Sequence, residues 1–167
     1  MEQREASGDA VMTRIGQAVM LLHGGDREEA RNRFRRIWSE IGECGHALHR
    51  CTLAHYMADT QDDPGDELAW DLRALAAAEG LTDPAEGPAR SAAAHHRDVT
   101  AVRAFFPSLH LNLAADYLKL QRYQAARSHL DRAWEAVGVL EDDGYGGGVR
   151  AAIGRLELRL RGSGAAG

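Results

Sequence analysis

"SLHLNLAADYLKLQRYQAARSHLDRAWEAV", residues 108–137, consists of two apolar patterns separated by "QRY" at 121–123. In both halves the apolar residues recur every three or four positions, which is the period of a helix with one buried face. A connection of this length places two consecutive helices side by side and antiparallel. The stretch therefore predicts a helical hairpin, and the same pattern elsewhere in the chain predicts further hairpins.

Two further hairpins are predicted upstream. "DAVMTRIGQAVMLLH" (9–23) and "REEARNRFRRIWSEIG" (27–42) are separated by "GGD" at 24–26, and "HALHRCTLAHYMADTQ" (46–61) and "DELAWDLRALAAAEG" (66–80) by "DDPG" at 62–65. Glycine favours the end of a helix, and a proline in the turn cannot continue one. The three hairpins thus occupy about 9–42, 46–80 and 107–140.

The remaining segments are a long connection and a C-terminal helix. Residues 81–99 contain two prolines and no apolar stripe, which predicts a loop or insertion, with its second half leading into the third hairpin either as loop or as a short helix. A helix over about 148–161 has Val149, Ile153, Leu156 and Leu160 on one stripe and is expected to cap the third hairpin. Residues 162–167 are expected to be a disordered tail. Strand patterns are nearly absent, so we predict a single all-α domain over 1–161.

The hairpins share a fixed spacing of packing residues. In the third hairpin these are Leu113, Ala114, Tyr117, Tyr123, Ala126, Leu130 and Ala133. In the first they are Ala18, Leu21, Gly25, Asp26, Ala30, Phe34 and Ile37. The second has Leu53, Ala54 and Met57 in its first helix, but its second helix fits only with about two extra residues in the turn.

This spacing resembles the tetratricopeptide repeat (TPR) family, over roughly residues 11–80 and 107–140. The resemblance implies a right-handed superhelical array of three helical hairpins, which the C-terminal helix would cap. A hairpin alone leaves an apolar face in water, so neighbouring hairpins have to stack. The family is defined by packing residues rather than by a reaction, so the resemblance implies protein binding and not catalysis.

Composition excludes several classes of partner. The chain of 167 residues has a formal net charge of −5, which argues against nucleic acid, because a phosphate-backbone binder needs a basic face. No apolar run approaches the roughly 20 residues that span a bilayer, so no membrane association is expected. Two cysteines make no disulfide framework, which favours a reducing cytoplasm. An open array has two exposed ends, so a homodimer is one expected form.

The resemblance also implies a binding surface. The first helix of each hairpin would line a concave groove that suits an extended peptide or a short helix of a protein partner. The expected groove residues are Cys51, Thr52, His55, Asp59, Ser108, Leu111, Asn112 and Lys119. In peptide-binding members of the family an asparagine at the position of Asn112 often holds ligand backbone or a terminal carboxylate, and Lys119 would add a complementary charge. Asp59 weakens the expectation of a carboxylate clamp. Neither a cofactor nor catalysis is part of this interpretation.

A metal or small-molecule site is the alternative interpretation. Cys51 and His55 lie one helical turn apart, so both can reach one ion, with His110 as a third ligand and Asp59 nearby. The same Cys51–His55 pair is the single hint of an enzyme in the sequence. No HExxH motif and no paired CxxC motif accompanies them, and His46, His49 and His55 do not share a helix face. Sequence alone leaves the groove and the metal site both open.

Overall fold

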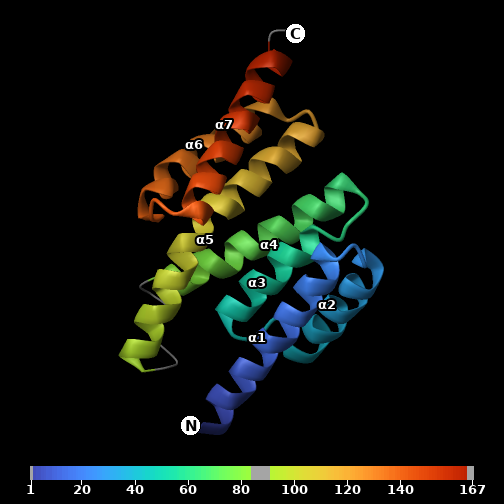
Figure 1. Cartoon of the computed structure of the whole chain (residues 1–167), viewed down its shortest axis with the longest axis vertical. Coiled ribbons are helices and arrows are strands. Elements are labelled where there is room, and N and C mark those ends of the chain that lie inside the picture. The colour runs from blue at the N-terminus through green and yellow to red at the C-terminus, as the bar shows by residue number, and fades with distance from the viewer. Residues whose placement is uncertain (1, 84–90, 165–167) are drawn as a thin grey trace. The chain divides into compact units, whose positions relative to one another are not determined.

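The computed structural model describes residues 2–83 and 91–164, and for residues 2–7 and 9 it describes the backbone alone. Every regular element in these ranges is helical and none is a strand, so the prediction of an all-α protein is confirmed. Figure 1 shows the elements. They are α1 (Glu2–His23), α2 (Arg27–Ile41), α3 (Ala47–Ala58), α4 (Pro64–Thr82), α5 (Ala92–Lys119), α6 (Tyr123–Ala136), the 3-10 turn η1 (Val137–Val139) and α7 (Gly144–Gly164).

Several helices are longer than the sequence pattern indicates. Helix α5 begins at Ala92 rather than near 107, and the Ser91 side chain caps it by accepting a hydrogen bond from the Ala94 amide at 3.2 Å. Half of the expected loop at 81–99 is therefore helical, and its residues 84–90 lie outside the described part. Helix α7 begins at Gly144 and includes residues 162–164 of the expected tail, whose last three residues also lie outside the description. Pro107 lies inside α5 without ending it.

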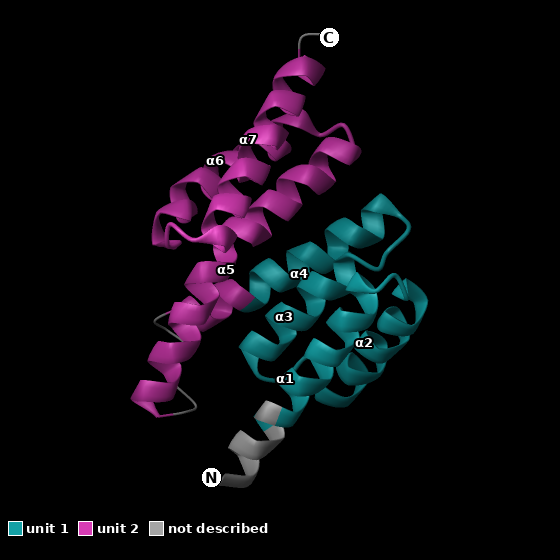
Figure 2. Ribbon diagram, in the orientation of Figure 1, with its two compact units in different colours: residues 1–77 teal, residues 78–167 magenta. Residues whose placement is uncertain are grey.

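The chain divides into two compact units, residues 1–77 and residues 78–167 (Figure 2). The boundary falls within α4. Each unit has a buried apolar cluster of its own.

In the first unit, the core lies between α1, α2 and α3. Its fully buried members include Ile15, Ala18, Ala30, Phe34, Ile37, Leu53 and Met57. The α1–α2 turn needs a glycine, because Gly25 has a φ of 94°, and the next residue, Asp26, caps α2 by accepting from the Glu29 amide at 3.3 Å. Trp38 of α2 meets Trp70 of α4 edge to face, with ring centroids 5.0 Å apart. This contact joins the start of α4 to the first unit.

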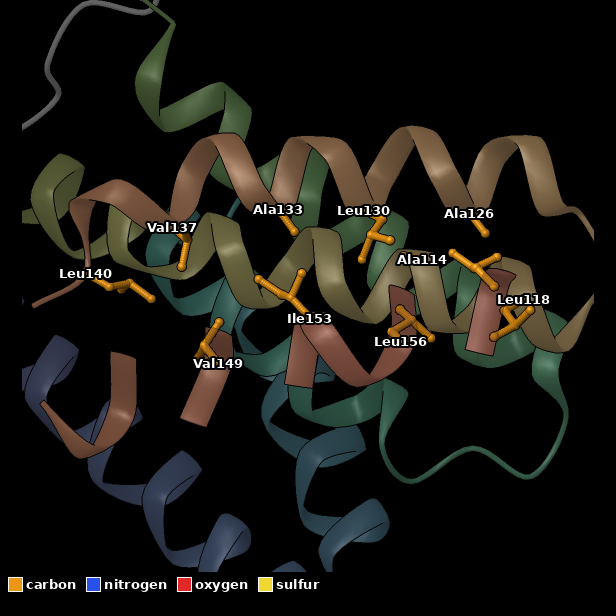
Figure 3. Close-up of a cluster of buried hydrophobic side chains, with 11 residues drawn as sticks. Ala114, Leu118, Ala126, Leu130, Ala133, Val137, Leu140, Val149, Ile153 and Leu156 are labelled. Atoms are coloured by element: carbon orange, nitrogen blue, oxygen red, sulfur yellow. The ribbon is translucent and has the colours of Figure 1, made fainter. Parts of the chain in front are cut away.

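In the second unit, α7 closes the apolar face of the α5–α6 hairpin, as Figure 3 shows. Val149, Ile153 and Leu156 of α7 point toward Leu130 and Ala133 of α6 and toward α5. Helix α7 thus covers the apolar face of the α5–α6 hairpin within this unit. Its packing follows from the predicted stripe of large side chains every three or four residues.

The turn before α7 is held by hydrogen bonds. Asp143 accepts from the Gly146 amide at 2.8 Å, and the Arg150 guanidinium donates to the carbonyl oxygen of Leu140 at 3.0 Å. Gly146 is buried so close to the preceding turn that an added Cβ would lie 2.1 Å from the carbonyl oxygen of Glu141. The start of α7 therefore requires glycine at this position.

Two arginines of α2 bind the chain where it leaves α3. Arg31 donates through its guanidinium to the carbonyl oxygen of buried Thr60, with Nε at 2.9 Å, and Arg27 donates to the carbonyl oxygen of Gln61 at 2.7 Å. Both also reach the Asp62 carboxylate. The last carbonyls of a helix have no partner within the helix, so Arg31 supplies one from α2.

We expect Arg31→Ala to destabilise the first unit by about 1–2 kcal/mol, because it removes the closer of the two charged donors to the buried Thr60 carbonyl and leaves only Arg27, at 3.2 Å. Arg35→Ala is the matched control on the same helix, since Arg35 is exposed and has no ion pair among the described residues. Urea denaturation of both variants measures the difference. Equal midpoints for the two variants would show that the arginine contact contributes nothing.

Candidate functional site

Two of the predicted groove residues of α3, Cys51 and Thr52, have buried side chains. Cys51 is 0% exposed, and burial raises the pKa of its thiol to about 12, although the charge of Arg50 acts in the opposite direction. The thiol is therefore protonated at neutral pH, whereas a metal ligand or a nucleophile needs the thiolate. Thr52 is also buried and donates its hydroxyl to the Leu48 carbonyl oxygen at 2.8 Å. In this conformation neither side chain offers surface to a peptide.

The other two predicted residues of α3 differ from each other. His55 is partly buried, and its Nδ1 lies 3.7 Å from Oδ1 of buried Asp71 on α4, which is too long for a hydrogen bond. Burial lowers the pKa of His55, while the charge of Asp59 acts in the opposite direction. Asp59 itself is exposed at the end of α3. His55 thus lies near two carboxylates, Asp59, which the sequence pattern indicates, and Asp71, which it does not.

The four predicted groove residues of α5 differ in their contacts and in their exposure. The Ser108 hydroxyl and the Tyr145 hydroxyl of α7 form a hydrogen bond of 2.9 Å, and Leu111 packs against the core of the second unit. Asn112 is half-buried and Lys119 is exposed in the last turn of the helix. Leu111 therefore contributes to packing, the Ser108 hydroxyl is engaged by Tyr145 at the surface, and Asn112 and Lys119 keep accessible surface.

The metal alternative depends on ligands that belong to different units. Cys51 and His55 are in the first unit and His110 is in the second. Within residues 2–83 and 91–164, no three His, Cys, Asp or Glu side chains are grouped so that they could hold a metal ion. Metal binding by Cys51, His55 and His110 therefore stays a prediction.

His110 has a different environment, which includes a second histidine. Its Nδ1 lies 3.0 Å from Nδ1 of His129 on α6, so one ring donates a hydrogen and the other accepts it. The two imidazoles stack with centroids 5.3 Å apart. Phe106 stacks on His110 and Tyr117 on His129, at 6.1 and 5.4 Å. Four rings thus form one column along the seam between α5 and α6, which we call the ring column.

One end of the ring column lies in an open depression of about 560 Å³. Its lining residues are Glu79, Arg103, Phe106, His110, Arg132, Glu135, Ala136 and Val139. Three of them, Arg103, Phe106 and His110, recur at helical spacing on one face of α5. That spacing is visible in the sequence, but the pairing with His129 and Arg132 depends on the register of α6 against α5.

Both histidines of the column are held neutral. Burial lowers the pKa of His110 to about 4, with further contributions from His129 and Arg132. Burial, and then the charge of Arg132, also lowers the pKa of His129. A charged imidazolium at either position would be desolvated and would lie near the Arg132 guanidinium. The neutral form of both histidines is therefore favoured at pH 7.

We expect the stability of the protein to fall as the pH is lowered from 7 toward 4.5. A histidine whose folded pKa lies below its unfolded value binds protons first in the unfolded state, so the free energy of unfolding decreases from about pH 6.5 down to the folded pKa. For His110 we expect about 1–2 kcal/mol, allowing for solvent at the open side of the column. Urea denaturation at several pH values measures it, and His110→Phe should flatten the dependence. An exposed-site control, His23→Gln, should leave it unchanged.

Comparison with known proteins finds no matching family model, no matching curated protein and no matching solved structure. Among the described residues, no helix combines the length and the apolar character required to cross a membrane. Function is therefore inferred from the side chains described above.

Proposed function

We propose that this protein is a TPR-like helical-repeat protein that binds a peptide or protein partner. The observation that carries the proposal is the burial of the repeated packing positions. In the first hairpin the buried members are Ala18, Ala30, Phe34 and Ile37, and in the third they are Leu113, Ala114, Ala126, Leu130 and Ala133. A spacing shared by two hairpins and used for packing in both supports a repeat whose function is binding.

Among the predicted groove residues, accessible surface remains at His55 and Asp59 in the first unit and at Asn112 and Lys119 in the second. The Asn112 amide can both donate to and accept from a peptide backbone, and the Lys119 ammonium can pair with a carboxylate. Cys51 and Thr52 are buried, Leu111 packs against the core of the second unit, and the Ser108 hydroxyl is engaged by Tyr145. In the second unit the proposed binding surface is thus the exposed side of α5 around Asn112 and Lys119.

Loss of Asn112 and Lys119 is expected to weaken partner binding at least tenfold. Cell extract is passed over the immobilised wild-type chain, over the Asn112→Ala, Lys119→Ala double variant, and over an Arg127→Ala control on α6, and bound proteins are quantified by mass spectrometry. A protein retained by the wild type and the control but lost from the double variant is then titrated in purified form by calorimetry.

The control is informative because Arg127 is exposed, carries the same charge as Lys119, and lies outside the proposed surface. Circular dichroism on all three proteins checks that the helices are intact. If the three retain the same proteins in the same amounts, the surface around Asn112 and Lys119 is not a binding site and the proposal is wrong.

A further inference from the structure

We propose that the depression at the end of the ring column binds a carboxylate that is attached to an apolar or aromatic group, such as an acidic side chain or the terminus of a peptide. The inference extends the proposed function, because it states a chemical feature that the partner would have. It is separate from the surface around Asn112 and Lys119 and is tested separately.

The positive charge for such a ligand comes from two arginines, one on each side of the α5–α6 seam. Arg103 and Arg132 are exposed and line the same depression. Among the residues that the structure describes, neither guanidinium has an ion pair or a hydrogen bond. By contrast, Arg14, Arg27, Arg31 and Arg150 each bind oxygen atoms of the protein itself. A guanidinium that lines a hollow and is not itself ion-paired is suited to a carboxylate ligand, which it can bind through two parallel hydrogen bonds.

The floor of the depression supplies a polar atom and an apolar surface. His110 is 7% exposed, and its Nδ1 is engaged by His129, which leaves Nε2 as the ring nitrogen that can meet a ligand. A bound carboxylate favours the tautomer in which His129 donates through Nδ1 and His110 carries its hydrogen on Nε2. Phe106, Ala136 and Val139 complete the lining with apolar surface. A ligand with a ring or an alkyl group beside its carboxylate can contact both the His110 nitrogen and the apolar lining.

Two carboxylates at the same site limit the ligand further. Glu79 and Glu135 also line the depression and repel a highly charged anion. Two arginines with two glutamates leave little net charge, so a bare phosphate gains less than a singly charged carboxylate whose apolar part is also buried. The same glutamates can accept hydrogen bonds from a peptide N–H, which suits an acylated amino acid.

The probe is N-acetylphenylalanine, titrated into the full chain and followed by NMR of the backbone amides. We expect a dissociation constant on the order of 1 mM, as is usual for a ligand of this size, with the largest shifts in residues 103–110 and 129–139. The neutral analogue N-acetylphenylalanine amide has the same shape without the charge and is expected to bind at least tenfold more weakly. Inorganic phosphate tests whether any anion suffices.

Three variants locate the site. Arg103→Gln and Arg132→Gln are each expected to weaken N-acetylphenylalanine at least fivefold, and Arg127→Gln, an exposed arginine of α6 outside the depression, is expected to have no effect. All three positions are on the surface, so the fold is kept and can be checked by the thermal midpoint.

The proposal is overturned if the amide binds as tightly as the acid, if Arg127→Gln has the same effect as the other two variants, or if no shifts occur up to 20-fold above the expected constant, about 20 mM. If inorganic phosphate binds as tightly as N-acetylphenylalanine, the apolar floor of the depression does not contribute to affinity, and this part of the proposal is wrong. A partner that is retained through Asn112 and Lys119 would still support the proposed function in each of these cases, so the two failures are distinguishable.

Discussion

Phe34→Ala is expected to destabilise the first unit by about 3–5 kcal/mol. Phe34 is fully buried at the centre of the cluster that joins α1, α2 and α3, and its ring stacks on Tyr56 with centroids 6.3 Å apart. Alanine removes the apolar surface of the ring and leaves a cavity that closely packed helices cannot fill. Because native proteins are stable by only about 5–15 kcal/mol, this is a large part of the total.

The measurement is urea denaturation of the full chain followed by circular dichroism, with Met20→Ala as the control. Met20 is a large apolar residue of α1 that is 74% exposed, so its loss should change the free energy of unfolding by less than about 0.5 kcal/mol. Hydrogen exchange locates the effect, and protection should fall in α1, α2 and α3. An effect of Phe34→Ala no larger than that of Met20→Ala would mean that this cluster is not the core of the first unit.

Gly146→Ala is expected to cost about 2–3 kcal/mol, although alanine is normally the better helix residue. The added methyl group would overlap the carbonyl oxygen of Glu141, which is backbone and can move only with the whole turn. A shift of this turn also stretches the hydrogen bonds from Arg150 to the carbonyl oxygens of Leu140 and Val137, at 3.0 and 3.4 Å. The start of α7 would then separate from the α5–α6 hairpin.

Gly148→Ala on the same helix is the matched control with the opposite expected sign. An added Cβ at Gly148 meets no atom within 4 Å, so alanine should increase stability by about 0.5–1 kcal/mol through helix propensity alone. For a chain of this length, 1 kcal/mol corresponds to a shift of about 2–4 °C in the thermal midpoint, which scanning calorimetry resolves. If both variants shift the midpoint upward, the contact at Gly146 does not constrain the turn.

The helices and their turns were predictable because their signals are local. A residue three or four positions away is a neighbour on the same helix, so the apolar stripe of α6 or α7 can be seen without knowing what it packs against. Gly25 and Asp26 end one helix and begin the next through their own backbone and side chain. The start of α5 was not predicted, because residues 92–99 have no apolar stripe. The N-cap at Ser91 is a signal of one residue, which by itself does not identify a helix start.

The candidate site was predicted less well, for a physical reason. Whether Cys51 is buried, whether Asp71 lies beside His55, and whether Ser108 meets Tyr145 all depend on which helices are neighbours and in what register. His110 was selected for its ligand chemistry, but its partner, His129, is 19 residues away on another helix. A spacing within one helix carries no information on that pairing.

From residues 108–137 outward, the amino-acid pattern specifies an all-helical chain of hairpins and the positions of most core residues, because helix periodicity and turn chemistry act within a few residues. The ring column, the arginine contacts to the end of α3 and the turn that needs Gly146 come from packing between helices that are distant in the chain. Such contacts depend on how well the surfaces of neighbouring helices fit together. Burial in that packing then raises the pKa of Cys51 and lowers the pKa of His110.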